Sequence, residues 1–166
     1  MRVILERSNL LKSLNHVHRV VERRNTIPIL SNVLLSAEGA SLEMKATDLD
    51  LEVTEATPAK VERGGATTVP AHLLYDIVRK LADGAEVMLK TDEDGNAMTV
   101  TSGRSSFRLQ CLPQSDFPEL SAGSFSHIFR LDSVALKGLI EKTQFAISTE
   151  ETRYYLNGIY LHTHEV

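Results

Sequence analysis

Apolar residues recur at helical spacing in three segments of the chain. The first helix is predicted over residues 8–21, with Ser8 as its N-cap. Its buried face is formed by apolar residues three or four positions apart: Leu10, Leu14, Val17 and Val21. The same reasoning predicts a second helix over residues 71–81, ended by Asp83 and Gly84, and a third over residues 133–147.

Strands are predicted where short apolar or alternating runs are bounded by turn residues. These runs lie at residues 3–5, 29–36, 41–46, 49–57, 86–91, 97–101, 106–112, 128–131 and 154–163. Acidic and apolar residues alternate from residue 48 onward, which predicts a half-buried strand with Asp48, Asp50 and Glu52 on one solvent-facing side. Helices placed between runs of strands predict an α+β fold.

The pattern begins a second time after a connector. Residues 113–126 are rich in Pro, Ser and Gly, which indicates an interdomain connector near residues 121–124. When the chain is shifted by 125 residues, residues 8–14 fall on residues 133–139 with four of seven identities, and strand, helix, loop and strand stay in register. We predict a complete domain over residues 1–120 and the truncated start of a second copy over residues 121–166. The chain is therefore expected to be an N-terminal fragment.

Charged residues are unevenly distributed along the chain. The net charge of −4 by itself argues against a nucleic-acid binder. However, residues 7–24 contain five basic residues and one acidic residue, whereas residues 38–62 contain seven acidic residues and two lysines. If these segments lie on different faces, one face of the protein is positive and the other is negative.

Composition limits the class of protein further. No apolar run approaches the roughly 18 residues of a membrane-spanning helix, so no membrane partner is expected. Cys111 is the only cysteine, which excludes an internal disulfide, and the histidines show no ligand spacing. We predict no metal, no cofactor and no catalytic residue, in a soluble cytosolic protein.

A row of cations is predicted on the first helix, opposite its apolar face. At 100° per residue, Lys12, His16, Arg19 and Arg23 fall within one stripe. Such a row can bind a polyanion backbone by charge alone, so that binding is independent of sequence and sensitive to salt. The alternative is the solvated face of an ordinary amphipathic helix. Arg24, next in the loop, can reach phosphates or simply follow a helix end.

The second helix has an unusually broad apolar face. Leu74, Val78 and Leu81 form one stripe, and Leu73 and Ile77 widen it. The extra width is typical of a subunit interface, or of a helix enclosed within its own domain.

Two shorter patterns could carry function. Arg153 stands beside Tyr154 and Tyr155, which is typical of side chains that stack on bases and bind phosphates, or of core tyrosines at a strand start. Asp48 and Asp50 could hold a divalent metal in a hydrolase, although a solvent-facing strand explains them better. A protein-docking domain that does not bind DNA is the other alternative.

Six strings occur in order along nearly the whole chain. They are residues 26–32 (TIPILSN), 46–50 (ATDLD), 65–71 (GATTVPA), 102–107 (SGRSSF), 112–118 (LPQSDFP) and 152–158 (TRYYLNG). Together they resemble the bacterial replicative sliding clamps, the β subunits of DNA polymerase III.

The resemblance implies a DNA-clamp (processivity) fold, in which each domain packs two helices on antiparallel sheets. It implies three such domains per subunit and a homodimeric ring that encircles duplex DNA, lined by helices. Such a processivity factor is the non-catalytic subunit of a DNA-directed DNA polymerase holoenzyme, a nucleotidyltransferase. Its expected partners are duplex DNA, the replicative polymerase and clamp-loader subunits, in the cytoplasm at the nucleoid.

The resemblance also implies roles for single residues. Arg24, Tyr154 and Tyr155 match DNA contacts, in addition to the cations of the first helix. Arg153 and Leu156 match edges of a pocket that takes short peptides from partner proteins. The first domain's side of the subunit interface is expected to include Leu73, Ile77, Leu81, Arg104, Phe107 and Leu109. Some family members have lysine in place of Leu73, so a charge pair is not expected at that position.

Overall fold

The computed structural model describes residues 1–23, 26–120 and 128–162. The chain divides into two compact units, Met1–Ser121 and Ala122–Val166. Each unit is described by itself below.

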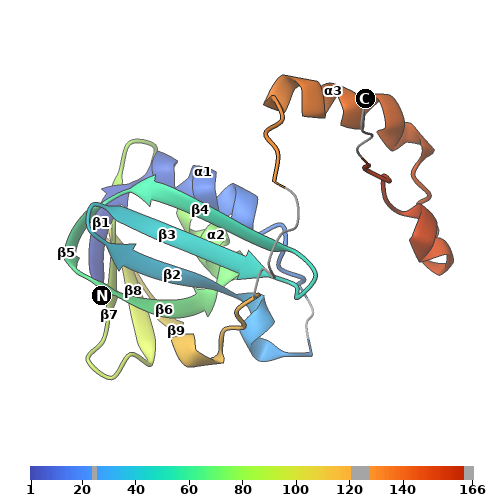
Figure 1. The fold of residues 1–166 in the computed structure, drawn as a ribbon. Coiled ribbons are helices and arrows are strands. Elements are labelled where there is room, and N and C mark those ends of the chain that lie inside the picture. The colour runs from blue at the N-terminus through green and yellow to red at the C-terminus, as the bar shows by residue number, and fades with distance from the viewer. Residues whose placement is uncertain (24–25, 121–127, 163–166) are drawn as a thin grey trace. The chain divides into compact units, whose positions relative to one another are not determined.

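The first unit contains two antiparallel sheets (Figure 1). The five-stranded sheet has the order β5-β1-β7-β8-β9, formed by β5 (Lys60–Arg63), β1 (Arg2–Glu6), β7 (Glu86–Thr91), β8 (Ala97–Ser102) and β9 (Ser105–Gln110). The four-stranded sheet has the order β4-β3-β2-β6, formed by β4 (Glu52–Pro58), β3 (Ser41–Thr47), β2 (Asn32–Glu38) and β6 (Gly65–Pro70). The first strand of the chain therefore lies inside its sheet, between β5 and β7.

Both helices of this unit pack on one face of the four-stranded sheet (Figure 1). Helix α1 (Arg7–Val17) contacts β3 and β4, α2 (Ala71–Lys80) contacts β2 and β6, and the helices contact each other. Leucines from the helices and both sheets meet in one core, whose fully buried members include Leu10, Leu14, Leu35, Leu74 and Leu89. Burial of each such side chain stabilises the fold by about 1.5–3 kcal/mol.

The first helix begins and ends earlier than the apolar spacing predicts. Its N-cap is Glu6 rather than Ser8, and the Ser8 hydroxyl donates a hydrogen bond to the Glu6 carboxylate at 2.7 Å. After α1 ends, Val21 is still buried in the core, but its carbonyl accepts a hydrogen bond from Nε2 of His72 on α2 at 2.7 Å. The segment after α1 is thus fixed by a contact with the second helix, which its own sequence does not reveal.

The strand predicted at residues 49–57 begins later, at residue 52, because residues 48–51 form a turn. The Asp48 carboxylate accepts hydrogen bonds from the N–H groups of Asp50 (3.0 Å) and Leu51 (2.7 Å), and Leu49 has a positive φ of 82°. An aspartate that bonds the backbone two or three residues ahead favours a turn over a strand. Strand β4 begins only at Glu52, so Asp48, Asp50 and Glu52 do not share a strand face.

The other observed element boundaries agree with the predicted boundaries to different degrees. The predicted second helix and the strands at residues 86–91 and 97–101 agree with α2, β7 and β8 to within a residue. Pro28–Ser31 forms a 3₁₀ helix (η1) instead of opening a strand, because proline fixes φ and lacks a donor. Strands β5 and β6, which are short and largely polar and lie around Gly64 and Gly65, were not predicted from the sequence. A second 3₁₀ turn, η2 (Gln114–Asp116), follows β9.

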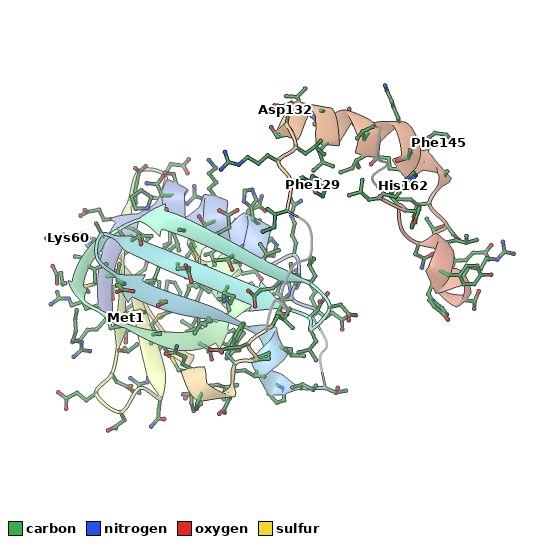
Figure 2. All side chains as sticks on the ribbon, in the orientation of Figure 1. Met1, Lys60, Phe129, Asp132, Phe145 and His162 are labelled. Carbon is green, nitrogen blue, oxygen red and sulfur yellow. The ribbon has the colours of Figure 1, made fainter. Side chains whose placement is uncertain are left out.

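The described part of the second unit is helical. It contains α3 (Ser133–Thr143) and two 3₁₀ segments, η3 (Gln144–Ala146) and η4 (Glu151–Leu156). The Asp132 carboxylate caps α3 by accepting hydrogen bonds from the N–H groups of Val134 (2.9 Å) and Ala135 (3.0 Å), and Figure 2 shows Asp132 where the helix begins.

The two strands predicted for this unit are wrong as far as the structure describes them. Residues 128–131 form no helix or strand. The 3₁₀ segment η4 occupies the start of the run predicted at residues 154–163, of which residue 163 lies outside the described residues. A strand is stabilised by hydrogen bonds to a neighbouring strand, and the described residues of this unit include no paired strands. Apolar side chains of this unit are correspondingly exposed, among them Phe145 at 85% (Figure 2).

Candidate nucleic-acid and subunit interfaces

The predicted row of cations lies only partly on α1. Lys12 and His16 are one turn apart on the exposed side of the helix, whereas Arg19 and Arg23 follow after the helix has ended. Lys12, Arg19 and Arg23 are exposed, and none of them forms an ion pair within the described residues. Arg24 lies outside the described residues. Three exposed cations therefore occupy the surface of α1 and of the segment that follows it.

One acidic residue interrupts the expected separation of charge. Nδ1 of His16 lies 2.7 Å from the Glu55 carboxylate, because β4 runs beside α1. A second acid of the same strand, Glu52, pairs with Lys45 on β3 at 3.3 Å. The acidic segment thus contributes one carboxylate to the helix face, and His16 does not add a free positive charge there.

An aromatic cluster joins the ends of the two helices. The ring of His18 stacks on Tyr75 with centroids 3.9 Å apart, and it meets His72 edge-on at 5.6 Å. Nδ1 of His18 donates a hydrogen bond to the Leu14 carbonyl at 2.7 Å. Burial lowers the pKa of His18, the hydrogen bond to Leu14 opposes this effect, and the neighbouring His72 and Arg19 add to it. The imidazole is therefore neutral near pH 7 and acts as a packing element.

This cluster could not be predicted from the sequence, because its members come from different elements. Only His72 and Tyr75, three residues apart on α2, share a helix face that spacing could identify. Their contact with His18 depends on how α1 and α2 cross.

The apolar face of α2 is wider than its packing against the core of the first unit requires. Leu74 and Val78 are fully buried, whereas Ile77 and Leu81 are partly buried and Leu73 is 50% exposed. The helix therefore presents an apolar edge to solvent in addition to the face that it packs on the sheet.

This edge lines a shallow hollow together with β9. The hollow has a volume of about 360 Å³ and is lined by Leu73, Asp76, Ile77, Lys80, Leu81, Ser105 and Phe107. The structure thus brings together four of the six residues expected at a subunit interface. Arg104 is exposed in the turn before β9 and does not line the hollow.

Leu109 is a core residue, and its assignment to the exposed interface is wrong. Phe107 and Leu109 are two residues apart on β9 and share a face of the strand. Phe107 lies at the edge and is 38% exposed, but Leu109 lies deeper and is only 1% exposed within the core of the unit. The resemblance places both residues at the subunit interface, but in this unit only Phe107 is exposed.

The second unit carries the tyrosine pair on an exposed 3₁₀ segment. Tyr154 and Tyr155 are 79% and 72% exposed, and their rings meet edge to face with centroids 5.7 Å apart. Arg153 forms an ion pair with Glu150 at 2.9 Å, and Leu156 is 45% exposed. The alternative that these tyrosines are core residues at a strand start is wrong for the unit as described.

The structure does not support the basis of the metal-hydrolase alternative. Within residues 1–23, 26–120 and 128–162, no three His, Cys, Asp or Glu side chains gather where they could hold a metal ion. Asp48 instead uses its carboxylate to close a turn. Burial raises the pKa of the Cys111 thiol, and a side-chain hydrogen bond with Thr67 partly offsets this, so the thiol is protonated near pH 7. Within the same residues, no helix is long and apolar enough to cross a membrane.

Comparison with known proteins identifies the family. The model of the DNA polymerase III beta subunit N-terminal domain matches residues 1–121, and that of the central domain matches residues 130–166. The chain therefore belongs to the DNA polymerase III beta subunit family.

Sliding clamps are similar to this chain both in sequence and in structure. The beta sliding clamp of Caulobacter vibrioides NA1000 is 55% identical over 98% of this chain, and that of Escherichia coli K12 is 41% identical over 98%. A sliding clamp from Bartonella birtlesii, solved with griselimycin, superposes with a TM-score of 0.93 at 61% identity over 99% of this chain. The chain spans 44% of the length of each of these proteins. The expected α+β clamp fold is confirmed by this superposition.

Proposed function

We propose that this chain is part of a DNA sliding clamp, a non-catalytic ring that encircles duplex DNA and tethers the replicative polymerase. The observation that carries the proposal is the set of exposed cations on and after α1, Lys12, Arg19 and Arg23, in a chain of the beta subunit family. Contacts to phosphates by charge alone hold DNA in any sequence. A ring needs only such weak contacts, because closure itself prevents escape.

The remaining DNA contacts are proposed from Arg24, Tyr154 and Tyr155. The exposed tyrosine rings offer flat surfaces and hydroxyl groups that suit bases and phosphates. Arg153 and Leu156 form one edge of a pocket for short peptides of the polymerase and the clamp loader. Exposure of Leu156 beside a cation supports this role, because peptide anchors are apolar groups oriented by a few polar contacts.

The exposed edge of α2 is proposed to meet a second copy of the protein. Leu73, Ile77, Leu81 and Phe107 present apolar surface around a hollow. Lys80 lines the same hollow, and Arg104 directly precedes its lining residue Ser105, so both could add charged contacts at the rim. An apolar centre with a charged rim is the usual arrangement of a stable protein interface. Two such contacts would close a homodimeric ring.

The test uses the protein encoded by the complete gene, loaded onto nicked circular DNA by its clamp loader. A ring remains on the circle and is lost once the DNA is cut at one site. Equal rates of loss from intact and cut circles would contradict the proposal.

The phosphate contacts are tested by replacing Lys12, Arg19 and Arg23 with alanine. We expect weaker binding to linear duplex DNA and a salt dependence of log K that is less steep by about 0.9 for each phosphate that is no longer bound. The matched control replaces Lys60 and Lys90, exposed lysines on β5 and β7, and leaves both quantities unchanged. If the triple variant binds DNA as tightly as the unaltered protein does, the chain is a protein-docking domain rather than a DNA-binding one.

A further inference from the structure

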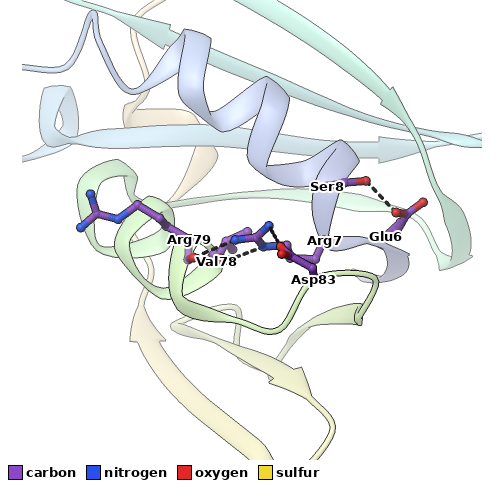
Figure 3. Close-up of polar contacts among 6 residues, drawn as sticks. All are labelled: Glu6, Arg7, Ser8, Val78, Arg79 and Asp83. Atoms are coloured by element: carbon purple, nitrogen blue, oxygen red, sulfur yellow. Dashed lines mark hydrogen bonds and ion pairs between the residues drawn. The ribbon is translucent and has the colours of Figure 1, made fainter.

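Arg7 connects the start of α1 to the end of α2. Its guanidinium donates hydrogen bonds from Nε to the Val78 carbonyl (3.1 Å), from Nη2 to the Arg79 carbonyl (2.8 Å) and from Nη1 to the Asp83 carboxylate (2.5 Å), as Figure 3 shows. Its backbone N–H donates to the Ala85 carbonyl at 2.9 Å. One residue thus holds the last turn of α2 and both ends of the loop that follows it.

This end of α2 lacks the usual cap of a helix. The residue after the helix, Leu81, has extended backbone angles (φ −70°, ψ 157°) instead of the left-handed angles that close a glycine cap. Gly84 does adopt a positive φ of 72°, but it lies three residues further on. The carbonyls of the last turn carry partial negative charge and need donors, and a cation is favourable there. Arg7 supplies both.

The contacts with Asp83 and with the carbonyls differ in strength. The side chain of Asp83 is 93% exposed, so its ion pair with Arg7 contributes little. The side chain of Arg7 is only 14% exposed, and its bond to the Val78 carbonyl is partly buried, so that bond is less accessible to water than the ion pair. Capping of the helix is therefore the main role of the guanidinium.

The turn that Arg7 holds also carries the exposed edge of α2. Val78 and Arg79 lie between Ile77 and Leu81, which line the hollow with Phe107. We propose that Arg7 is a positioning residue for the self-association surface, because it fixes the turn from which Ile77 and Leu81 project. This inference rests on the proposed function and adds a residue that lies on the other helix of the unit.

The test measures the dimer dissociation constant of the protein encoded by the complete gene, far below its unfolding temperature. Arg7→Lys keeps the charge, but a single ammonium group cannot supply three donors in a planar fork. We expect a dissociation constant raised about tenfold or more. Amide exchange is expected to speed up within residues 77–85. Arg2→Lys is the matched control, since Arg2 on β1 forms a half-exposed ion pair with Glu62 at 3.0 Å.

A second variant keeps the test decisive if Arg7→Lys folds poorly. Asp83→Lys alters an exposed side chain and places a cation beside Arg7, which should displace the guanidinium and weaken the dimer about threefold or more. Asp94→Lys, the same change on the exposed β7–β8 loop, should leave the dimer unchanged.

A purely structural role is separated from positioning by Leu42→Val, which loosens the core from β3. If this variant weakens the dimer as much as Arg7→Lys, the inference is overturned. It is also overturned if the unaltered protein dimerises and the Arg7→Lys and Asp83→Lys variants both dimerise as tightly as the unaltered protein. If the unaltered protein does not dimerise, the proposed function fails and the inference fails with it.

Discussion

The two units begin with the same sequence pattern but bury it to different extents. Leu14 on α1 and Leu139 on α3 are 125 residues apart and occupy the same place in the repeat. Leu14 is fully buried, whereas Leu139 is 51% exposed. Strands β3 and β4 cover α1, but the described residues of the second unit form no strand. A helix can form from its local sequence, whereas its burial depends on strands encoded elsewhere in the chain.

The two helices also begin in different ways. The Asp132 carboxylate caps α3 by two local hydrogen bonds, whereas no side chain caps the N-terminus of α1. Instead, the first residue of α1, Arg7, is bonded to the end of α2. The start of α3 is therefore fixed by its neighbours in sequence, and the start of α1 by tertiary contacts.

The largest effect is expected from shortening the two equivalent leucines. Leu14→Ala should lower the free energy of unfolding of the first unit by about 2–5 kcal/mol, because it leaves a cavity in a closed core. Leu139→Ala should change stability by less than about 1 kcal/mol, since its side chain already meets solvent. Unfolding in urea measures both, and equal losses would contradict the difference between the units.

Removing the cap tests the second difference. Asp132→Ala should destabilise α3 by about 0.5–2 kcal/mol, because two N–H groups lose their acceptor. Ser8→Ala, the equivalent first-turn change in α1, should have an effect of less than about 0.5 kcal/mol, since Ser8 does not cap that helix. Amide exchange of each helix reports the change. A larger effect at Ser8 would show that α1 depends on local capping after all.

A smaller effect, a dependence of stability on pH, is expected in the first unit. Because burial lowers the pKa of His18 in the folded state, the unfolded chain binds a proton more readily. Stability should therefore fall as the pH drops below about 6.5, the ordinary pKa of histidine. Unfolding in urea at a series of pH values should show this loss, and His18→Phe, which keeps a ring against Tyr75, should reduce it. The exposed His16→Gln is the control, and a pH profile unaffected by His18→Phe would refute the assignment.

The sequence predicted the elements whose signals are local. The spacing of Leu10 and Leu14 identified the buried face of α1, and the loop between β7 and β8 was recognised from its turn residues. The apolar spacing over residues 133–147 indicated a third helix, which the structure has as α3 (Ser133–Thr143). Each of these features depends on residues within a few positions of one another.

Features that depend on contacts between elements could not be predicted. The acidic alternation around Asp50 resembles a strand, but hydrogen bonds from the backbone to Asp48 make it a turn. The resemblance places Phe107 and Leu109 at the same interface, yet only the packed core decides which of them is covered. The role of Arg7 was invisible for the same reason, since its partners are more than 70 residues away in the sequence.

The position of β1 inside its sheet has a consequence for the order of folding during synthesis. Arg2 pairs with Lys90 of β7 and Arg63 of β5, so the strand made first can be completed only after most of the unit has been translated. At about 5–20 residues per second, the ribosome needs about 4–18 s to produce the segment that β1 awaits. The four-stranded sheet, whose strands lie closer together in sequence, has its pairing partners sooner. In the nascent chain the apolar strand β1 is thus still unpaired with β7, while the sheet that α1 covers can already form.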